Sequence, residues 1–185
     1  MDSNIYLAVV ALLVLVILIR FIKASNRLNR YQVVVKESKK NVDIALAKRY
    51  DTICELIKVA KSFATHEKAV FADLVQLRGG SVQEINKALQ NQEQALGKIY
   101  ALAEAYPELK SSAEFVNLQE QIDDENEQLA AAKRIVNGNI STFNQEVVSF
   151  PVSIVAKLKG MSQLDFLVEE DLESKKSIDK FDYEV

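Results

Sequence analysis

The sequence is poor in the residues that build turns, disulfides and metal sites. Its 185 residues include no tryptophan, one cysteine, one histidine, two prolines and five glycines. The single Cys54 excludes an internal disulfide, and one cysteine with one histidine, His66, cannot supply the usual zinc ligands. A sheet protein needs more glycine and proline for its turns. The composition therefore favours an all-α chain that holds no metal.

The sequence also lacks the familiar motifs of catalysis and nucleotide binding. Gly79-Gly80 has no Lys-Ser/Thr of a phosphate-binding loop after it, and no Gly-x-Ser-x-Gly elbow occurs. His66 has no glutamate three residues before it, which a di-iron bundle requires. A formal net charge of −3 gives no basic surface for nucleic acid. We therefore expect a protein that is not an enzyme, uses no cofactor and binds no nucleic acid.

One long apolar run stands at the N-terminus. Between positions 5 and 22 the only polar side chains are those of Tyr6 and Arg20. A helix over this range is about 27 Å long at 1.5 Å per residue, close to the ~30 Å hydrocarbon core of a bilayer. Residues 1–4 lack the positive charge that opens a signal peptide, and Lys23 does not suit a cleavage site. The run therefore predicts an uncleaved transmembrane helix over 5–22.

Flanking charge predicts the orientation of this helix. No lysine or arginine precedes the run, whereas four cations and no acidic residue fall between positions 20 and 30: Arg20, Lys23, Arg27 and Arg30. Basic residues stay on the cytoplasmic side of a membrane. We expect residues 1–4 outside the cell and residues 23–185 in the cytoplasm. The same cations should favour anionic lipid headgroups, by about 1 kcal/mol each.

The region after the run has the pattern of an antiparallel, up-and-down helical bundle. Apolar residues recur at intervals of three and four, which predicts long helices over 26–78, 81–106 and 112–149 and a short one over 152–159. Capping boxes are expected at Ser81 to Glu84 and at Ser111 to Glu114, and a kink in the first helix at 38–41 or 64–66. Apolar residues expected in the core are Leu28, Tyr31, Val35, Val42, Leu46, Ile53, Ile57, Ile85, Leu89, Leu96, Ile99, Ala103, Tyr106, Phe115, Leu118, Ile122, Leu129, Val136, Phe143, Val147 and Phe150.

Several polar residues occupy positions where this pattern expects an apolar side chain. Glu125 and Asn139 lie on the seam of the third helix and Gln92 on that of the second. A buried carboxylate needs a partner, which Arg49 or Arg78 can supply. The candidate polar network is Arg49, Asp51, Arg78, Glu104, Glu125, Asn126, Asn137 and Asn144. We interpret it as a satisfied layer that sets helix register; a functional pocket and simple exposure are the alternatives.

The C-terminal residues differ from the bundle in composition. Residues 168–185 hold seven acidic residues, three lysines and few apolar side chains, which predicts a disordered tail. Leu164, Phe166 and Leu167 are expected to dock the start of this tail onto the bundle. The bundle is therefore assigned to residues 23–167.

The residues of the bundle resemble the LemA family over about 28–167. Two stretches carry the resemblance: Lys48 to Asp51 with His66-Glu67, and Ala103 to Lys110 followed by Phe115 and Leu118-Gln119. Further matches in the expected order are Glu125-Asn126, Arg134, Asn137, Phe143-Asn144 and Phe150-Pro151. The chain departs from the family at three places, where Cys54-Glu55 replaces a usual Pro-Asn, Val136 a tyrosine and Lys133 an arginine.

The resemblance implies a helical bundle anchored in a bacterial inner membrane, and it implies no reaction. We therefore expect a non-enzymatic, single-pass protein whose cytoplasmic bundle is a protein-interaction or membrane-organising module. Its partner is an unknown protein or another copy of itself. Two alternatives stay open: a bundle that senses a ligand or signal through a polar pocket, and a protein that shapes the membrane surface through its basic juxtamembrane stalk.

Overall fold

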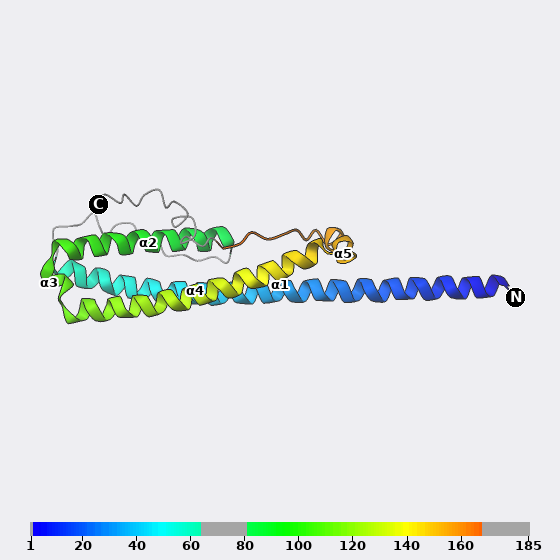
Figure 1. Cartoon of the computed structure of the whole chain (residues 1–185), viewed down its shortest axis with the longest axis horizontal. Coiled ribbons are helices and arrows are strands. Elements are labelled where there is room, and N and C mark those ends of the chain that lie inside the picture. Colours follow the sequence, from blue (N-terminus) through cyan, green and yellow to red (C-terminus); the bar gives the residue numbers. More distant parts are fainter. Residues whose placement is uncertain (1, 64–80, 168–185) are drawn as a thin grey trace, which may run out of the picture.

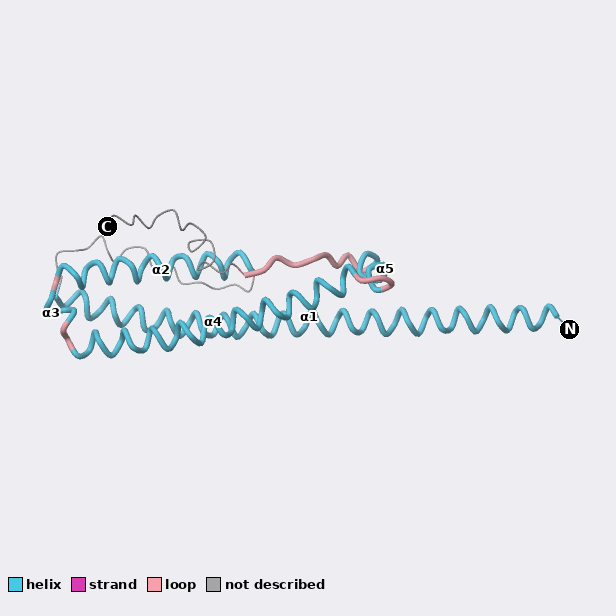
Figure 2. The backbone as a smooth tube through the Cα atoms, in the orientation of Figure 1, coloured by secondary structure: helices cyan, strands magenta, loops and turns pink. Residues whose placement is uncertain are grey.

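The computed structural model describes residues 2–63 and 81–167. Within them the regular structure is entirely helical (Figure 2), so the predicted all-α class is confirmed. Arg78, His66 and the predicted tail over 168–185 lie outside the described residues. The helices are α1 (Asp2–Phe63), α2 (Val82–Ala105), α3 (Pro107–Lys110), α4 (Ala113–Val148) and α5 (Val152–Leu158).

Helix α1 is the axis of the molecule. It runs without a break from the apolar run into the bundle, so the two helices expected over 5–22 and from position 26 onward form one element of 62 residues. At 1.5 Å per residue this helix is about 93 Å long. It stays helical through 38–41, one of the two places where a kink was expected, and the other place, 64–66, lies outside the described residues.

The other helices pack along the part of α1 that follows the apolar run. Helix α4 lies along α1 for most of its own length, and α2 packs along α1 at the end far from the N-terminus (Figure 1). Helix α5 packs against α1 and α4 at the opposite end, close to the apolar run (Figure 1). The apolar run of α1 extends beyond all of them (Figure 1).

The buried apolar residues form two clusters along this bundle. We call the cluster nearer the apolar run the proximal core, and it comprises Leu28, Val35, Val42, Leu46, Ile85, Ala88, Leu89, Leu129, Val136, Ile140, Phe143, Val147, Val152, Val155, Ala156 and Leu167. The distal core comprises Ile53, Leu56, Ile57, Val59, Ala60, Leu96, Ile99, Leu102, Ala103, Leu109, Phe115, Leu118 and Ile122. Each core takes side chains from α1, α2 and α4, because the apolar positions of these helices recur at three and four residues.

The helix ends follow local capping chemistry. At α2 the Ser81 hydroxyl accepts from the Glu84 backbone N–H (3.2 Å) and the Glu84 carboxylate accepts from the Ser81 N–H (3.1 Å), so this capping box is confirmed. The second predicted box is wrong. The N-cap of α4 is Ser112, which accepts from Phe115 N–H at 3.3 Å, while the Ser111 hydroxyl donates to the Pro107 carbonyl.

Three aromatic residues differ from the expected core. Tyr31 and Tyr106 are only partly buried, and Phe150 is 82% exposed. Tyr106 caps the short turn α3, which Pro107 begins in the first helical position where its missing N–H costs nothing. Phe150 lies beyond the end of α4 at Val148, so the helical period that placed it in the core no longer applies.

An extended segment, residues 161–167, follows α5 and runs back along the bundle toward the start of α2 (Figure 1). Leu167 is buried, and Met161 and Leu164 pack against the proximal core. Phe166 is 50% exposed. The segment therefore covers part of the proximal core, and two of its three predicted docking residues contact that core.

Candidate functional site

A layer of polar side chains separates the proximal core from the distal core. We call it the buried polar layer; it consists of Arg49, Thr52, Gln92 and Glu125, which are 1%, 3%, 3% and 2% exposed. On all three long helices the two cores are seven residues apart: Leu46 to Ile53, Leu89 to Leu96, and Ile122 to Leu129. Arg49, Gln92 and Glu125 each fall three residues into that interval. One apolar layer of a heptad pattern is thus replaced by a polar one.

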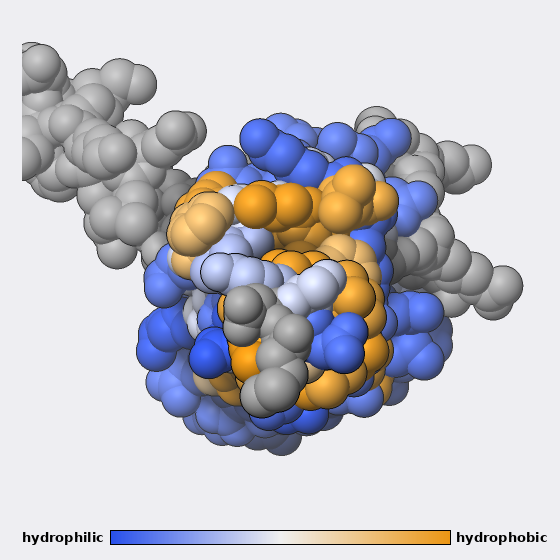
Figure 3. Space-filling model, turned by 90° about the vertical axis from the view of Figure 1, so that its right-hand side faces the viewer, coloured by the Kyte–Doolittle hydropathy of each residue, from blue (hydrophilic) through white to orange (hydrophobic). Residues whose placement is uncertain are grey.

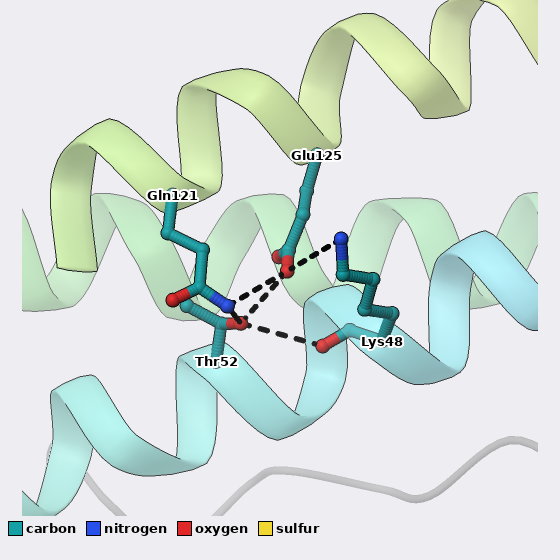
Figure 4. Close-up of polar contacts among 4 residues, drawn as sticks. All are labelled: Lys48, Thr52, Gln121 and Glu125. Carbon is teal, nitrogen blue, oxygen red and sulfur yellow. Dashed lines mark hydrogen bonds and ion pairs between the residues drawn. The ribbon is translucent and has the colours of Figure 1, made fainter.

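Glu125 is held by donors from two helices. The Thr52 hydroxyl donates to its Oε1 at 2.9 Å and the Gln121 amide donates to the same oxygen at 3.2 Å (Figure 4). The Gln121 amide is also 3.0 Å from the Thr52 oxygen. Lys48 Nζ lies 3.9 Å from Oε1 and half of its side chain is exposed, so it adds a long, solvent-screened attraction. These contacts compensate for the burial of the carboxylate.

Arg49 reaches across to α2. Its Nη2 donates to the carboxylate of Glu93, whose side chain is 53% exposed while that of Arg49 is 1% exposed. The expected pairing of Arg49 with Glu125 is therefore replaced by two separate interactions. A carboxylate at the surface stays partly hydrated, so this ion pair needs less desolvation than a pair with the buried Glu125.

Gln92 ties α2 to the backbone of α1. Its amide nitrogen donates to the Leu46 carbonyl at 2.9 Å. The Leu46 carbonyl lies inside α1, where it already accepts a backbone hydrogen bond of the helix. The bond from Gln92 is therefore an additional one, and it fixes the position of α2 along α1. Such a contact sets register, because it is lost if either helix slides by one turn.

Four buried polar atoms of the layer have no hydrogen-bond partner among the described residues. They are Arg49 Nε and Nη1, Gln92 Oε1 and Glu125 Oε2. Two are donors and two are acceptors. A buried polar atom that lacks a partner is unusual in a folded protein, so the layer has spare capacity for water or a small polar ligand.

Electrostatics link this layer to Tyr100 on α2. Burial raises the pKa of Tyr100, the carboxylates of Asp123 and Glu93 raise it further, and the positive charge of Arg49 opposes them. The phenol therefore stays neutral at physiological pH and remains a hydrogen-bond donor.

Two asparagines form a second polar cluster, which we call the asparagine clamps. Asn144 accepts from Leu164 N–H and donates to Leu164 O, both at 2.8 Å. Asn137 accepts from Leu167 N–H at 2.8 Å and donates to Leu167 O at 3.1 Å. Because the two asparagines are seven residues apart, they share one face of α4. They pair with the backbone of the extended segment, as a neighbouring strand would.

The predicted network is thus divided among several places. Arg49 and Glu125 lie in the buried polar layer, and Asn137 and Asn144 form the clamps. The remaining candidates within the described residues are Asp51 and Glu104, which are exposed, and Asn126 and Asn139, which are partly buried. Arg78 lies outside the described residues.

Sequence reasoning did not find Thr52, Glu93 or Gln121. The signal was present for Gln121, since it precedes Glu125 by four residues and such pairs share a helix face. The thiol of Cys54 is partly buried. Within the described residues no group of three or more histidine, cysteine or acidic side chains is placed to hold a metal ion.

The cations after the apolar run all lie at the surface of α1. Arg20, Lys23, Arg27 and Arg30 are exposed, and Arg27 pairs with Glu146 of α4 at 2.8 Å. The preceding segment has the length and apolar composition needed to cross a membrane, and none of its side chains is buried in the bundle.

The fold defines an all-α bundle carried on a long apolar helix and divided by one polar layer. The model of the LemA family matches residues 38–180, which is most of the chain, and the protein therefore belongs to the LemA family. The matched region contains the whole buried polar layer and both asparagine clamps, whereas the apolar run precedes it. Comparison with individual curated proteins gives no match.

Proposed function

We propose that this protein is a non-enzymatic, single-pass protein of a bacterial inner membrane whose cytoplasmic bundle binds other proteins or organises the membrane. The observation that carries the proposal is the continuity of α1, which is one helix from the apolar run to Phe63. A bundle joined in this way has a fixed place and direction relative to its anchor. Holding a partner at a fixed place requires no reactive group.

The contacts next to the apolar run support this role. Arg27 of α1 pairs with Glu146 of α4, and Lys159 donates to the Ser25 hydroxyl at 3.0 Å. The bundle thus begins within two turns of the apolar run rather than on a flexible linker. Residues 23–63 continue for about 60 Å at 1.5 Å per residue, so the bundle offers long lateral faces to a protein partner or a second copy.

The charge pattern supports the orientation. Arg20, Lys23, Arg27 and Arg30 are exposed, although Arg27 also pairs with Glu146, and exposed cations at this end of the run suit the cytoplasmic surface. In this arrangement the N-terminus is outside the cell. Protease added to intact cells should leave the bundle uncut, and lysis should expose it; cleavage in intact cells would reverse the topology.

Crosslinking in intact membranes, read by mass spectrometry, tests the binding role. The wild-type chain should yield specific crosslinks from its bundle to a protein partner or to another copy. The matched control carries a short Gly/Ser insertion after Lys23, which leaves the bundle sequence unchanged but makes the connection flexible. We expect the insertion to scatter these crosslinks. A wild-type chain that gives no specific crosslinks and is monomeric in detergent would contradict the proposal.

A ligand-sensing bundle is the second candidate, favoured by the four unpartnered polar atoms of the buried polar layer. In this case Glu125→Ala should abolish binding of a small polar ligand while the bundle stays folded. Binding is read as a ligand-dependent rise in melting temperature of the full chain. A Glu125→Ala variant that only melts at lower temperature assigns the layer a structural role.

A further inference from the structure

The proximal end of the bundle exposes large apolar side chains where the chain turns from α4 into α5. Phe150, Ile154 and Leu158 are 82%, 53% and 72% exposed, and we call them the apolar corner. Ile154 and Leu158 are four residues apart and share a helix face. The other face of α5 carries Val152, Val155 and Ala156, which are buried in the proximal core.

Helix α5 is therefore apolar both toward the bundle and away from it. Only Ser153 and Lys157, which are four residues apart, form a polar side of α5. A helix with apolar faces on two sides is normally covered on both, by protein or by lipid. The other exposed apolar residues of the bundle include Val33 and Ile44 of α1, which are separated by three turns. Single residues of that kind need no explanation, whereas the apolar corner gathers three large side chains within nine residues.

Contacts between α5 and α1 fix the height of the apolar corner above the apolar run. The Lys159 ammonium donates to Ser25 at 3.0 Å and to Asn29. These residues follow Ile22 by three and seven positions, about 5 and 10 Å along the helix axis. The headgroup region on each side of the hydrocarbon core is about 5–7 Å thick, so the apolar corner lies at headgroup level when the run spans a bilayer.

The view along α1 from its N-terminal end shows the same arrangement. In Figure 3 a patch of apolar surface lies on one side of the protruding apolar helix, and much of the remaining bundle end is hydrophilic. This end faces the direction in which the bilayer lies when α1 crosses it. The apolar corner and the anchor therefore point to the same leaflet.

The charges around the apolar corner suit an anionic membrane surface. No acidic residue occurs between Glu146 and Asp165 or between Asp2 and Glu37. Lys157 and Lys159 are exposed beside the apolar corner, and Arg30 is exposed on α1. Interfacial helices combine an inserted apolar face with lysine and arginine at the headgroups.

We propose that the apolar corner is a second membrane contact, with Phe150, Ile154 and Leu158 inserted at the headgroup–acyl boundary of the leaflet that α1 enters. It holds the proximal end of the bundle against that leaflet. The occupant of this surface is lipid rather than another protein. The inference goes beyond the proposed function, because it holds whichever partner the rest of the bundle binds.

The absence of tryptophan from the chain makes a direct test possible. The full chain with Phe150→Trp or Leu158→Trp is reconstituted in phosphatidylcholine–phosphatidylglycerol vesicles that contain doxyl-labelled lipid. Both positions are exposed, so the added rings leave the core intact. Val116→Trp, 39% exposed in the first turn of α4 at the far end of the bundle, is the matched control, and Val14→Trp in the apolar run reports insertion of the anchor.

We expect lipid-bound doxyl groups to quench both corner tryptophans several-fold more than Val116→Trp, and aqueous acrylamide to quench them less. Corner tryptophans that respond to both quenchers as Val116→Trp does would overturn the proposal. So would protection from acrylamide without doxyl quenching, because a protein then covers the apolar corner. Failure of Val14→Trp to be quenched by doxyl lipid would instead contradict the anchor, and with it the proposed function.

Discussion

The two halves of the bundle close their cores in different ways. The distal core is enclosed by α1, α2 and α4, with Leu109 of α3 at its end. Over much of the proximal core α1 and α4 are joined instead by α5 and the extended segment 161–167. A helix satisfies its own backbone hydrogen bonds, whereas an extended chain must find partners elsewhere. The asparagine clamps supply them, so closing a core with an extended chain requires particular polar side chains on the neighbouring helix.

The boundary between the halves has its own chemistry. Apolar cores accept many relative positions of two helices, because any apolar side chain fits roughly against another. Arg49, Gln92 and Glu125 accept few, since each bond joins a specific pair of atoms on different helices. The buried polar layer therefore fixes the register that the two cores leave loosely defined.

Truncation of one large core residue in each half should have the largest effect on stability and should show whether the two halves unfold independently. Phe115→Ala leaves a cavity in the distal core, and Phe143→Ala leaves one in the proximal core, because both side chains are at most 2% exposed. Each should lower the free energy of unfolding by about 3–5 kcal/mol. Hydrogen exchange should accelerate first in the truncated half. Equal acceleration of both halves in both variants would show that the bundle unfolds as one unit. It would contradict the view that the two halves open separately.

Removal of the buried carboxylate should have a smaller but still large effect. Glu125→Ala leaves Thr52 and Gln121 without their acceptor and should cost about 1–3 kcal/mol in unfolding free energy. Glu120→Ala, at an exposed site of the same helix, should stay within about 0.5 kcal/mol of wild type. Chemical denaturation measures both. Equal unfolding free energies for the two variants would contradict a structural role of the buried polar layer.

Loss of one asparagine clamp should loosen the proximal half alone. Asn144→Ala removes both bonds to Leu164 and should cost about 1–3 kcal/mol, from ~0.5–1.5 kcal/mol for each of the two hydrogen bonds. Asn144→Asp keeps an acceptor for Leu164 N–H but cannot donate to Leu164 O, so an intermediate loss is expected. Exchange of the Leu164 amide and proteolysis of 161–167 report the change. Unaltered protection in Asn144→Ala would show that apolar contacts alone hold the segment.

The capping box of α2 should give the smallest effect. Its bonds to Ser81 lower the pKa of Glu84 below its ordinary value of 4.5. A carboxyl group with a lowered folded-state pKa contributes stability that is present above pH 4.5 and is lost as the pH falls through the folded-state pKa. The stability difference between wild type and Glu84→Gln should therefore shrink on acidification below pH 4.5. A difference that does not change with pH would contradict the cap.

Local signals predicted most of the fold. The capping box at Ser81 and the prolines at 107 and 151 act over a few residues, so the helix ends near them follow from the sequence. The start of α4 was misplaced by one residue because Pro107–Lys110 forms its own turn and uses the Ser111 hydroxyl. Phe150 was misplaced because a helical period was carried past the last residue of α4.

The candidate site was predictable only in part. Gln92 and Glu125 interrupt the apolar seams of their helices, which the sequence shows directly, whereas Arg49 was expected only as a partner for the carboxylate. Their partners depend on how the helices rotate against each other, so Glu93 could not be assigned to Arg49 in advance. The spacing of Asn137 and Asn144 placed them on one face, but their partner is the backbone of an extended segment, which has no side-chain pattern.

The uninterrupted α1 has a mechanical consequence. Where its apolar run crosses a bilayer, the helix is a lever with a short arm in lipid and an arm of about 60 Å in water, at 1.5 Å per residue. A change of roughly 10° in tilt, within the range that bilayer thickness imposes on such helices, swings the far tip of the bundle sideways by about 10 Å. Differences in bilayer thickness are thereby amplified into displacements on the scale of a helix diameter.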